Sequence, residues 1–220
     1  MKTIIRHYHS HPRGMIKEFN IVKALYSAAC NNTLVNGKTI TIDDVLEKCF
    51  TGNHFRYLHL TAQQRLNLTV NAVNALKSHN ILNSNPVDFE DLYDKVKLAI
   101  GSLNQVGRLI LYDTTKMIGH ILTPQIVPQK YVYTQSGAKT GAKILLGKKR
   151  MSWRVPVTEF QQLFPNEQSI YVEDMLCIYK KYFTLNGVKK GVTFSNGNNN
   201  PNPNIKTRCC NNNVNPKSHC

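Results

Sequence analysis

The residues best suited to hold a ligand lie between positions 137 and 154. Gly137-Ala-Lys-Thr-Gly141 combines two glycines and an alanine with Lys139 and Thr140, at a point where a helix is predicted to begin. A helix N-terminus offers unpaired backbone N–H groups and a partial positive charge, so it favours an anion. This stretch therefore predicts a helix start that suits an anion.

The chain is strongly basic from this helix start onward. Six cations and no acid occur in residues 139–154, namely Lys139, Lys143, Lys148, Lys149, Arg150 and Arg154. The only tryptophan, Trp153, lies among them. Cations pair with phosphate oxygens, and an aromatic face stacks on an unpaired base. A solvated loop that Trp153 anchors to the core explains the same run, and both interpretations stay open.

The stretch from Tyr133 to Leu145 resembles the second half of a helix-hairpin-helix element. In that family a Gly-x-Gly hairpin turn leads into a helix beginning G-x-K-T-A, whose N–H groups and Lys hold a nucleic-acid phosphate. Gly137, Lys139 and Thr140 match this pattern. Gly141 replaces the family's Ala, and Gln135 stands at the position of its first Gly. The resemblance implies a nucleic-acid contact, whereas the alternative is a helix start with small residues for packing.

Two other groups are weaker candidates for chemistry. His7, His9 and His11 alternate, so an extended strand would place them on one side, where they would bind a metal loosely. An exposed, solvated cluster is the simpler interpretation. Asp113 lies in an apolar stretch and is a candidate catalytic acid, or else a carboxylate bonded to a nearby loop or to Arg108. No second acid or Lys accompanies Asp113 at an interpretable spacing, so the sequence leaves open whether the protein is an enzyme.

The candidate residues must be positioned by a scaffold, and the spacing of apolar residues along the chain predicts a helical one. A long apolar helix is predicted from Leu103 to about Leu122, with apolar residues at helical spacing. A connection containing Pro then leads into the basic helix. Further helices are predicted over residues 15–30, 42–50, 62–79, 86–100, 157–164 and 169–183. Thr41 and Thr61 are the expected N-caps of two of them.

The fold class that follows is all-α, a single multi-helix domain over residues 15–185 with a helix-hairpin-helix-like central unit. Residues 1–14 are expected to form a flexible arm. The Asn- and Pro-rich stretch 186–220 lacks periodic apolar residues, so we expect a disordered tail. No cofactor motif is present, and no cofactor is expected.

The protein carries a net charge of +15 over 220 residues. Such an excess of positive charge favours a polyanion as its binding partner. The sequence has no run of about 18 apolar residues and no apolar signal-peptide core, so we expect no membrane association and a cytoplasmic location.

The leading hypothesis is a nucleic-acid-binding protein that contacts phosphates, without sequence specificity, through a helix N-terminus and a basic loop. DNA is favoured over RNA as the partner. One alternative is a glycosylase- or nuclease-like enzyme that uses the same surface. Another is a basic module that binds an acidic protein. The oligomeric state is not indicated by the sequence.

Overall fold

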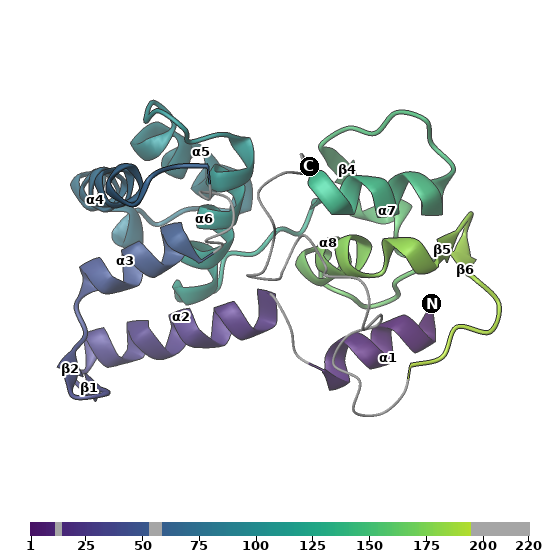
Figure 1. Cartoon of the computed structure of the whole chain (residues 1–220), viewed down its shortest axis with the longest axis horizontal. Coiled ribbons are helices and arrows are strands. Elements are labelled where there is room, and N and C mark those ends of the chain that lie inside the picture. Colours follow the sequence, from purple (N-terminus) through teal and green to yellow (C-terminus); the bar gives the residue numbers. More distant parts are fainter. Residues whose placement is uncertain (12–14, 53–58, 195–220) are drawn as a thin grey trace. The chain divides into compact units, whose positions relative to one another are not determined.

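The computed structural model of the chain describes residues 1–11, 15–52 and 59–194, and is mostly helical (Figure 1). The α-helices are α1 (Lys2–Ser10), α2 (Met15–Cys30), α3 (Ile42–Thr51), α4 (Ala62–Ser78), α5 (Phe89–Ile100), α6 (Arg108–Ile121), α7 (Ser136–Leu146) and α8 (Ser169–Ile178). Short 3-10 helices are η2 (Ile81–Asn83), η3 (Val157–Glu159) and η4 (Lys180–Tyr182). The helical class predicted from the sequence is confirmed.

Short strands, which the sequence analysis did not predict, form antiparallel pairs. They are β1 (Leu34–Val35) with β2 (Lys38–Thr39), β3 (Tyr131–Tyr133) with β4 (Arg154–Pro156), and β5 (Phe183–Thr184) with β6 (Gly187–Val188). The β3–β4 pair joins residues more than twenty positions apart, and such non-local pairing leaves little trace in local sequence patterns.

The chain divides into two compact units, where a single helical domain was expected. Unit 1 contains residues 1–15 and 128–220, and unit 2 contains residues 16–127. Helix α6 belongs to unit 2 and α7 to unit 1, so the two helices expected to share one central element lie in different units. The reason is their packing: α6 packs on α3 and α5, whereas α7 packs on α8.

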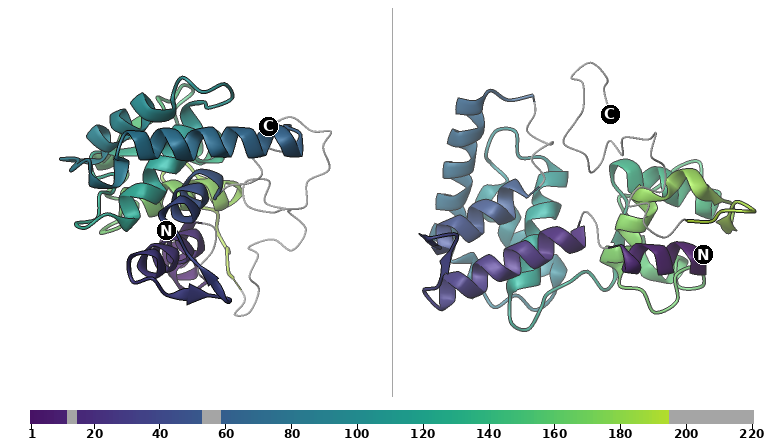
Figure 2. Two further views of the ribbon diagram at one scale, coloured as in Figure 1. Left: turned by 90° about the vertical axis from the view of Figure 1, so that its left-hand side faces the viewer. Right: turned by 60° about the horizontal axis from the view of Figure 1, so that its bottom comes forward.

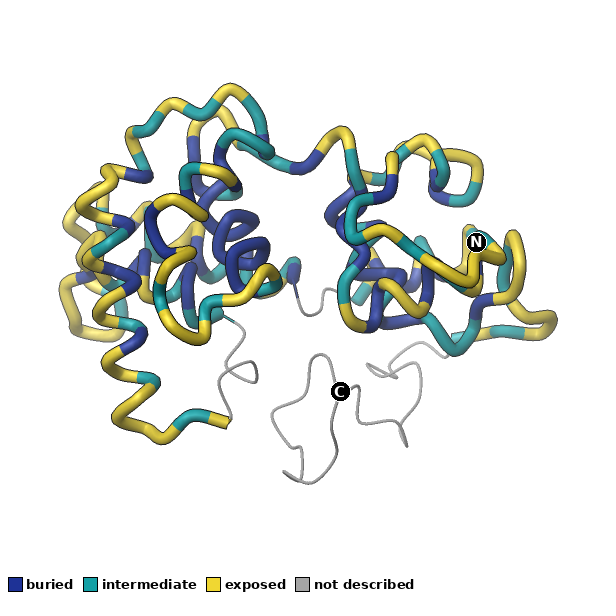
Figure 3. The backbone as a smooth tube through the Cα atoms, turned by 90° about the horizontal axis from the view of Figure 1, so that it is seen from above, coloured by how far each residue is buried: buried dark blue, intermediate teal, exposed yellow. Residues whose placement is uncertain are grey.

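In unit 2, α6 is the central helix. Every residue from Ile110 to Gly119 is buried, and Figure 3 shows buried positions gathered in the interior of the unit. The helix begins at Arg108, later than predicted, because Gly107 is extended and serves as its N-cap. Gly119 allows a close approach, since a Cβ there would lie 2.1 Å from the carbonyl oxygen of Ile126.

The predicted N-caps of α3 and α4 are confirmed as capping boxes. The Thr41 hydroxyl accepts from the Asp44 amide, and the Asp44 carboxylate accepts from the Thr41 amide at 2.8 Å. Thr61 and Gln64 make the same reciprocal bonds at the start of α4. Each box satisfies amides that the first turn leaves unpaired, which fixes where the helix begins.

In unit 1, α7 and α8 lie side by side (Figures 1 and 2). The two backbones approach closely at Gly141, where a Cβ would lie 2.1 Å from the carbonyl oxygen of Leu176. The predicted helix over residues 157–164 is only the short η3, and the predicted helix over 169–183 ends at Ile178.

Helix α1 replaces the flexible arm expected for residues 1–14. Ile4 and Tyr8 are buried one turn apart, and α1 packs on α8. The Tyr8 hydroxyl donates to Asp174 Oδ2 at 2.8 Å. At the C-terminal end of the predicted domain, the expected boundary was residue 185, but strand β6 lies after it and pairs with β5. The remaining part of the predicted tail, residues 195–220, lies outside the described residues.

Candidate nucleic-acid interface

The start of α7 lies beside the end of the basic run. Thr134 extends the β3–β4 ladder, because its amide donates to the Trp153 carbonyl at 2.9 Å. Its hydroxyl donates to the Ser152 carbonyl at 2.5 Å. Gln135, the N-cap of α7, follows directly. The structure thus brings the predicted anion-binding helix start together with Trp153 and Arg154.

The first turns of α7 are only partly available to a ligand. Ser136, Lys139 and Thr140 are exposed, and the first turn contains no acid. Gly137 and Gly141 are buried. Close backbone approach of a phosphate at Gly137 therefore lacks geometric support, and Gly141 serves the packing of α7 on α8. The exposed hydroxyl and ammonium groups are the better candidates for contact with an anion.

The loop cations lie at the opposite end of α7. Lys148, Lys149 and Arg150 are exposed and follow Gly147, which ends the helix in the left-handed conformation at φ +62°. Lys148 forms an ion pair with Glu159. A helix of 11 residues is about 16 Å long, so the predicted cations form a strip along α7 instead of a single pocket.

Trp153 and Arg154 are held by neighbouring aromatic rings. The Arg154 guanidinium carbon lies 4.3 Å from the centroid of the Trp153 ring and 5.5 Å from that of Tyr133. The Trp153 ring also meets Tyr133 edge to face, with centroids 5.2 Å apart. These contacts favour Trp153 as an anchor and not as an open stacking platform. They also restrict the position of the Arg154 cation.

Four lysines that the sequence analysis did not include lie near the C-terminal end of α7. Lys180 and Lys181 belong to η4, which packs on α7, and Lys189 and Lys190 follow β6. The Asn186 amide donates to the Leu145 carbonyl at 2.8 Å, which holds the β5–β6 hairpin against that end of the helix. We define the basic end of α7 as Lys148, Lys149, Arg150, Lys180, Lys181, Lys189 and Lys190.

Two positive charges of the basic end, those of Lys181 and Lys189, lie close enough to affect each other. The pKa of Lys181 is lowered by burial and, secondarily, by the nearby positive charge of Lys189. A bound anion would reverse the second effect, because an opposite charge favours the protonated ammonium. The two Lys-Lys pairs were visible in the sequence, but only the packing of η4 and of the β5–β6 hairpin on α7 brings them to this helix.

Asp113 is an internal ion-pair partner within unit 2. Its Oδ1 lies 3.2 Å from Lys116 Nζ, whereas the sequence analysis named Arg108 or a loop as its partner. Lys116 is fully buried, and its ammonium also lies 4.3 Å from the centroid of the Tyr112 ring. A Lys-plus-Asp arrangement, which the sequence analysis did not find, is therefore present one helical turn apart. Its burial favours a role in the core.

The three N-terminal histidines do not share one side, because α1 is a helix and not a strand. His7 is buried, with Nδ1 2.8 Å from the Tyr179 hydroxyl, and its ring stacks on His11 at 4.6 Å. His9 points to Glu167, at 2.9 Å. In the part of the chain that the structure describes, no three His, Cys, Asp or Glu side chains are grouped to hold a metal ion.

The charge of the molecule is distributed unequally between the units. Unit 1 carries 17 Lys and Arg against 4 Asp and Glu. Unit 2 carries 11 against 9. Nearly all of the net charge of +15 therefore belongs to the unit that contains α7 and its basic end.

No known family matches this chain. Searches of protein-family models, curated proteins and solved structures gave no significant similarity. The resemblance to a helix-hairpin-helix element thus rests on residues 133–145 alone. None of the helices among residues 1–11, 15–52 and 59–194 is long and apolar enough to cross a membrane.

Proposed function

We propose that the protein binds nucleic acid without sequence specificity, through cations of unit 1 that contact backbone phosphates. The observation that carries the proposal is the charge asymmetry, 17 cations against 4 acids in unit 1 and 11 against 9 in unit 2. Clustered positive charge on one part of a molecule attracts a polyanion and steers its approach.

The arrangement along α7 supports a long, regularly charged ligand. Lys139 lies near the start of the helix, and the basic end begins roughly 12 Å further along the axis, where the helix ends. One strand of a DNA duplex carries a phosphate roughly every 3.4 Å along the axis, so several phosphates span this strip. Lysine contacts to phosphate carry no sequence information, which is why no base preference is included in the proposal.

A salt titration with a mixed-sequence DNA duplex tests this function. The variant Lys148→Ala/Lys149→Ala/Arg150→Ala removes three exposed cations of the basic end. Its matched control, Lys17→Ala/Lys23→Ala/Lys97→Ala, removes three exposed cations of unit 2. We expect the first variant to bind at least tenfold more weakly at low salt. The slope of log K against log salt should become shallower by roughly 0.9 for each phosphate that is no longer neutralised.

The same titration contains the outcomes that would contradict the proposal. Equal weakening in the two triple variants would show that total charge, and not this surface, governs binding. Absence of any binding to DNA or RNA would reject the function. Tighter binding to polyglutamate than to DNA of equal charge would favour the acidic-protein alternative.

A further inference from the structure

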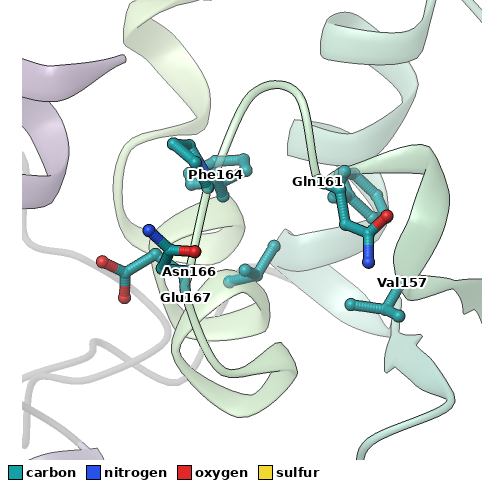
Figure 4. A pocket seen from close by; sticks show the side chains of 8 residues that line it. Val157, Gln161, Phe164, Asn166 and Glu167 are labelled. Atoms are coloured by element: carbon teal, nitrogen blue, oxygen red, sulfur yellow. The ribbon is translucent and has the colours of Figure 1, made fainter.

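Unit 1 contains a hollow of about 310 Å³ between η3 and the start of α8 (Figure 4). It is lined by Val157, Phe160, Gln161, Phe164, Pro165, Asn166, Glu167 and Val172. Figure 4 shows Val157 and Gln161 on one side of the hollow and Asn166 and Glu167 on the other. Its volume is at the lower end of the range of about 300–1,000 Å³ for ligand sites, so it suits one small group.

The lining divides into an apolar floor and a polar rim. Phe160, Phe164 and Val172 are at most 2% exposed and lie beneath the floor, while the more exposed Val157 and Pro165 supply its accessible apolar surface. Gln161 and Asn166 are exposed and offer amides that both donate and accept hydrogen bonds. Glu167 offers a carboxylate, which His9 Nε2 holds from 2.9 Å. An anionic ligand would be repelled by Glu167, and a purely aliphatic one would leave these polar groups unsatisfied.

The hollow adjoins the basic end of α7. Lys148 forms its ion pair with Glu159, the residue immediately before Phe160 in the chain. Val157, which lines the hollow, directly follows β4, the strand that begins at Arg154. When the phosphates of a nucleic-acid strand contact Lys148, Lys149 and Arg150, one of its bases can therefore reach the hollow.

We propose that this pocket holds one unpaired nucleobase of a single strand bound along the basic end of α7. This inference rests on the proposed function, and it adds that the protein prefers unpaired nucleic acid to a duplex. A base has apolar faces for the floor and a polar edge of donors and acceptors for the rim. A duplex keeps its bases stacked, so only a single strand or an unpaired position supplies this group without an unstacking cost.

Comparison of a mixed-sequence single strand with an abasic strand of the same length tests the pocket. Both have the same phosphates, so only the base contacts differ. We expect wild type to bind the base-containing strand at least about fivefold more tightly, as one stacked base typically provides. Val157→Phe fills the hollow and should remove this preference, while binding of the abasic strand stays unchanged.

Two further variants complete the test. Thr158→Phe places the same ring on an exposed neighbour outside the lining, and should keep the preference. Gln161→Ala removes a rim amide without adding bulk, and should weaken the preference even if Val157→Phe folds poorly. Equal binding of both strands by wild type, or a preference unchanged in both pocket variants, would overturn the pocket while leaving polyanion binding intact. Failure to bind either strand would overturn the proposed function itself.

Discussion

At the scale of single residues, Asp113 and Lys116 form a buried ion pair within α6. A fully buried ammonium is costly unless charged or polar partners compensate it. Lys116 has Asp113 at 3.2 Å and the face of Tyr112 at 4.3 Å. Both residues lie within α6, so the arrangement is set by one turn of the helix and enclosed by its neighbours.

We predict that Asp113→Ala destabilises the protein by about 3–5 kcal/mol, because it removes the carboxylate from beside a buried cation. Urea unfolding followed by circular dichroism would measure the change. Asp113→Leu combined with Lys116→Met should be less destabilising than the single variant, since it removes both charges. Wild-type stability for Asp113→Ala would show that the pair does not support the core. If the wild-type protein cleaves DNA, loss of that cleavage in an Asp113 variant with wild-type stability would instead support the catalytic interpretation of Asp113.

At the scale of elements, the contact between α7 and α8 decides what the glycines of α7 do. Gly141 faces the backbone of α8, and a Cβ would lie 2.1 Å from the Leu176 carbonyl oxygen. Gly137 is buried as well. Of the two glycines that resemble a phosphate-binding helix start, Gly141 thus allows close helix packing and Gly137 is buried, whereas Lys139 between them is exposed.

We predict that Gly141→Ala destabilises unit 1 by about 1–3 kcal/mol, because the two helix backbones must move apart. Thermal unfolding would report the change. Gly187→Ala is the control in the same unit, since a Cβ there has only the Thr184 hydroxyl at 3.8 Å and should cost little. An unchanged melting temperature for Gly141→Ala, accompanied by weaker DNA binding, would restore Gly141 to the ligand site.

At the scale of the whole molecule, the two units differ in charge and each has its own packed helices. Unit 2 is continuous in sequence and is organised around the buried α6, whereas unit 1 combines both ends of the chain. Each unit therefore has its own packed helices, and unit 1 carries most of the net positive charge.

We predict that residues 16–127, expressed alone, unfold cooperatively and bind DNA at least tenfold more weakly than the full chain. The segment has its own core, yet its 11 cations are nearly balanced by 9 acids. Circular dichroism and a low-salt binding titration would measure the two properties. A fragment that folds and retains full affinity would move the binding surface to unit 2.

Several local features of this protein could be predicted from its amino-acid sequence. Its apolar spacing fixed α2 from Met15 to Cys30, and Thr41 and Thr61 marked helix starts, because capping and amphipathic periodicity depend on residues within a few positions. The run of six cations without an acid over residues 139–154 was also evident in the sequence.

Tertiary structure alone decided how these features combine. It separated α6 from α7, buried Gly137, placed Lys189 and Lys190 at the end of α7, and paired Asp113 with Lys116. It also formed the hollow beside Phe160. Some of these features depend on contacts between residues far apart in the sequence, and others on which face of a helix is covered by neighbouring elements. Local propensities specify neither.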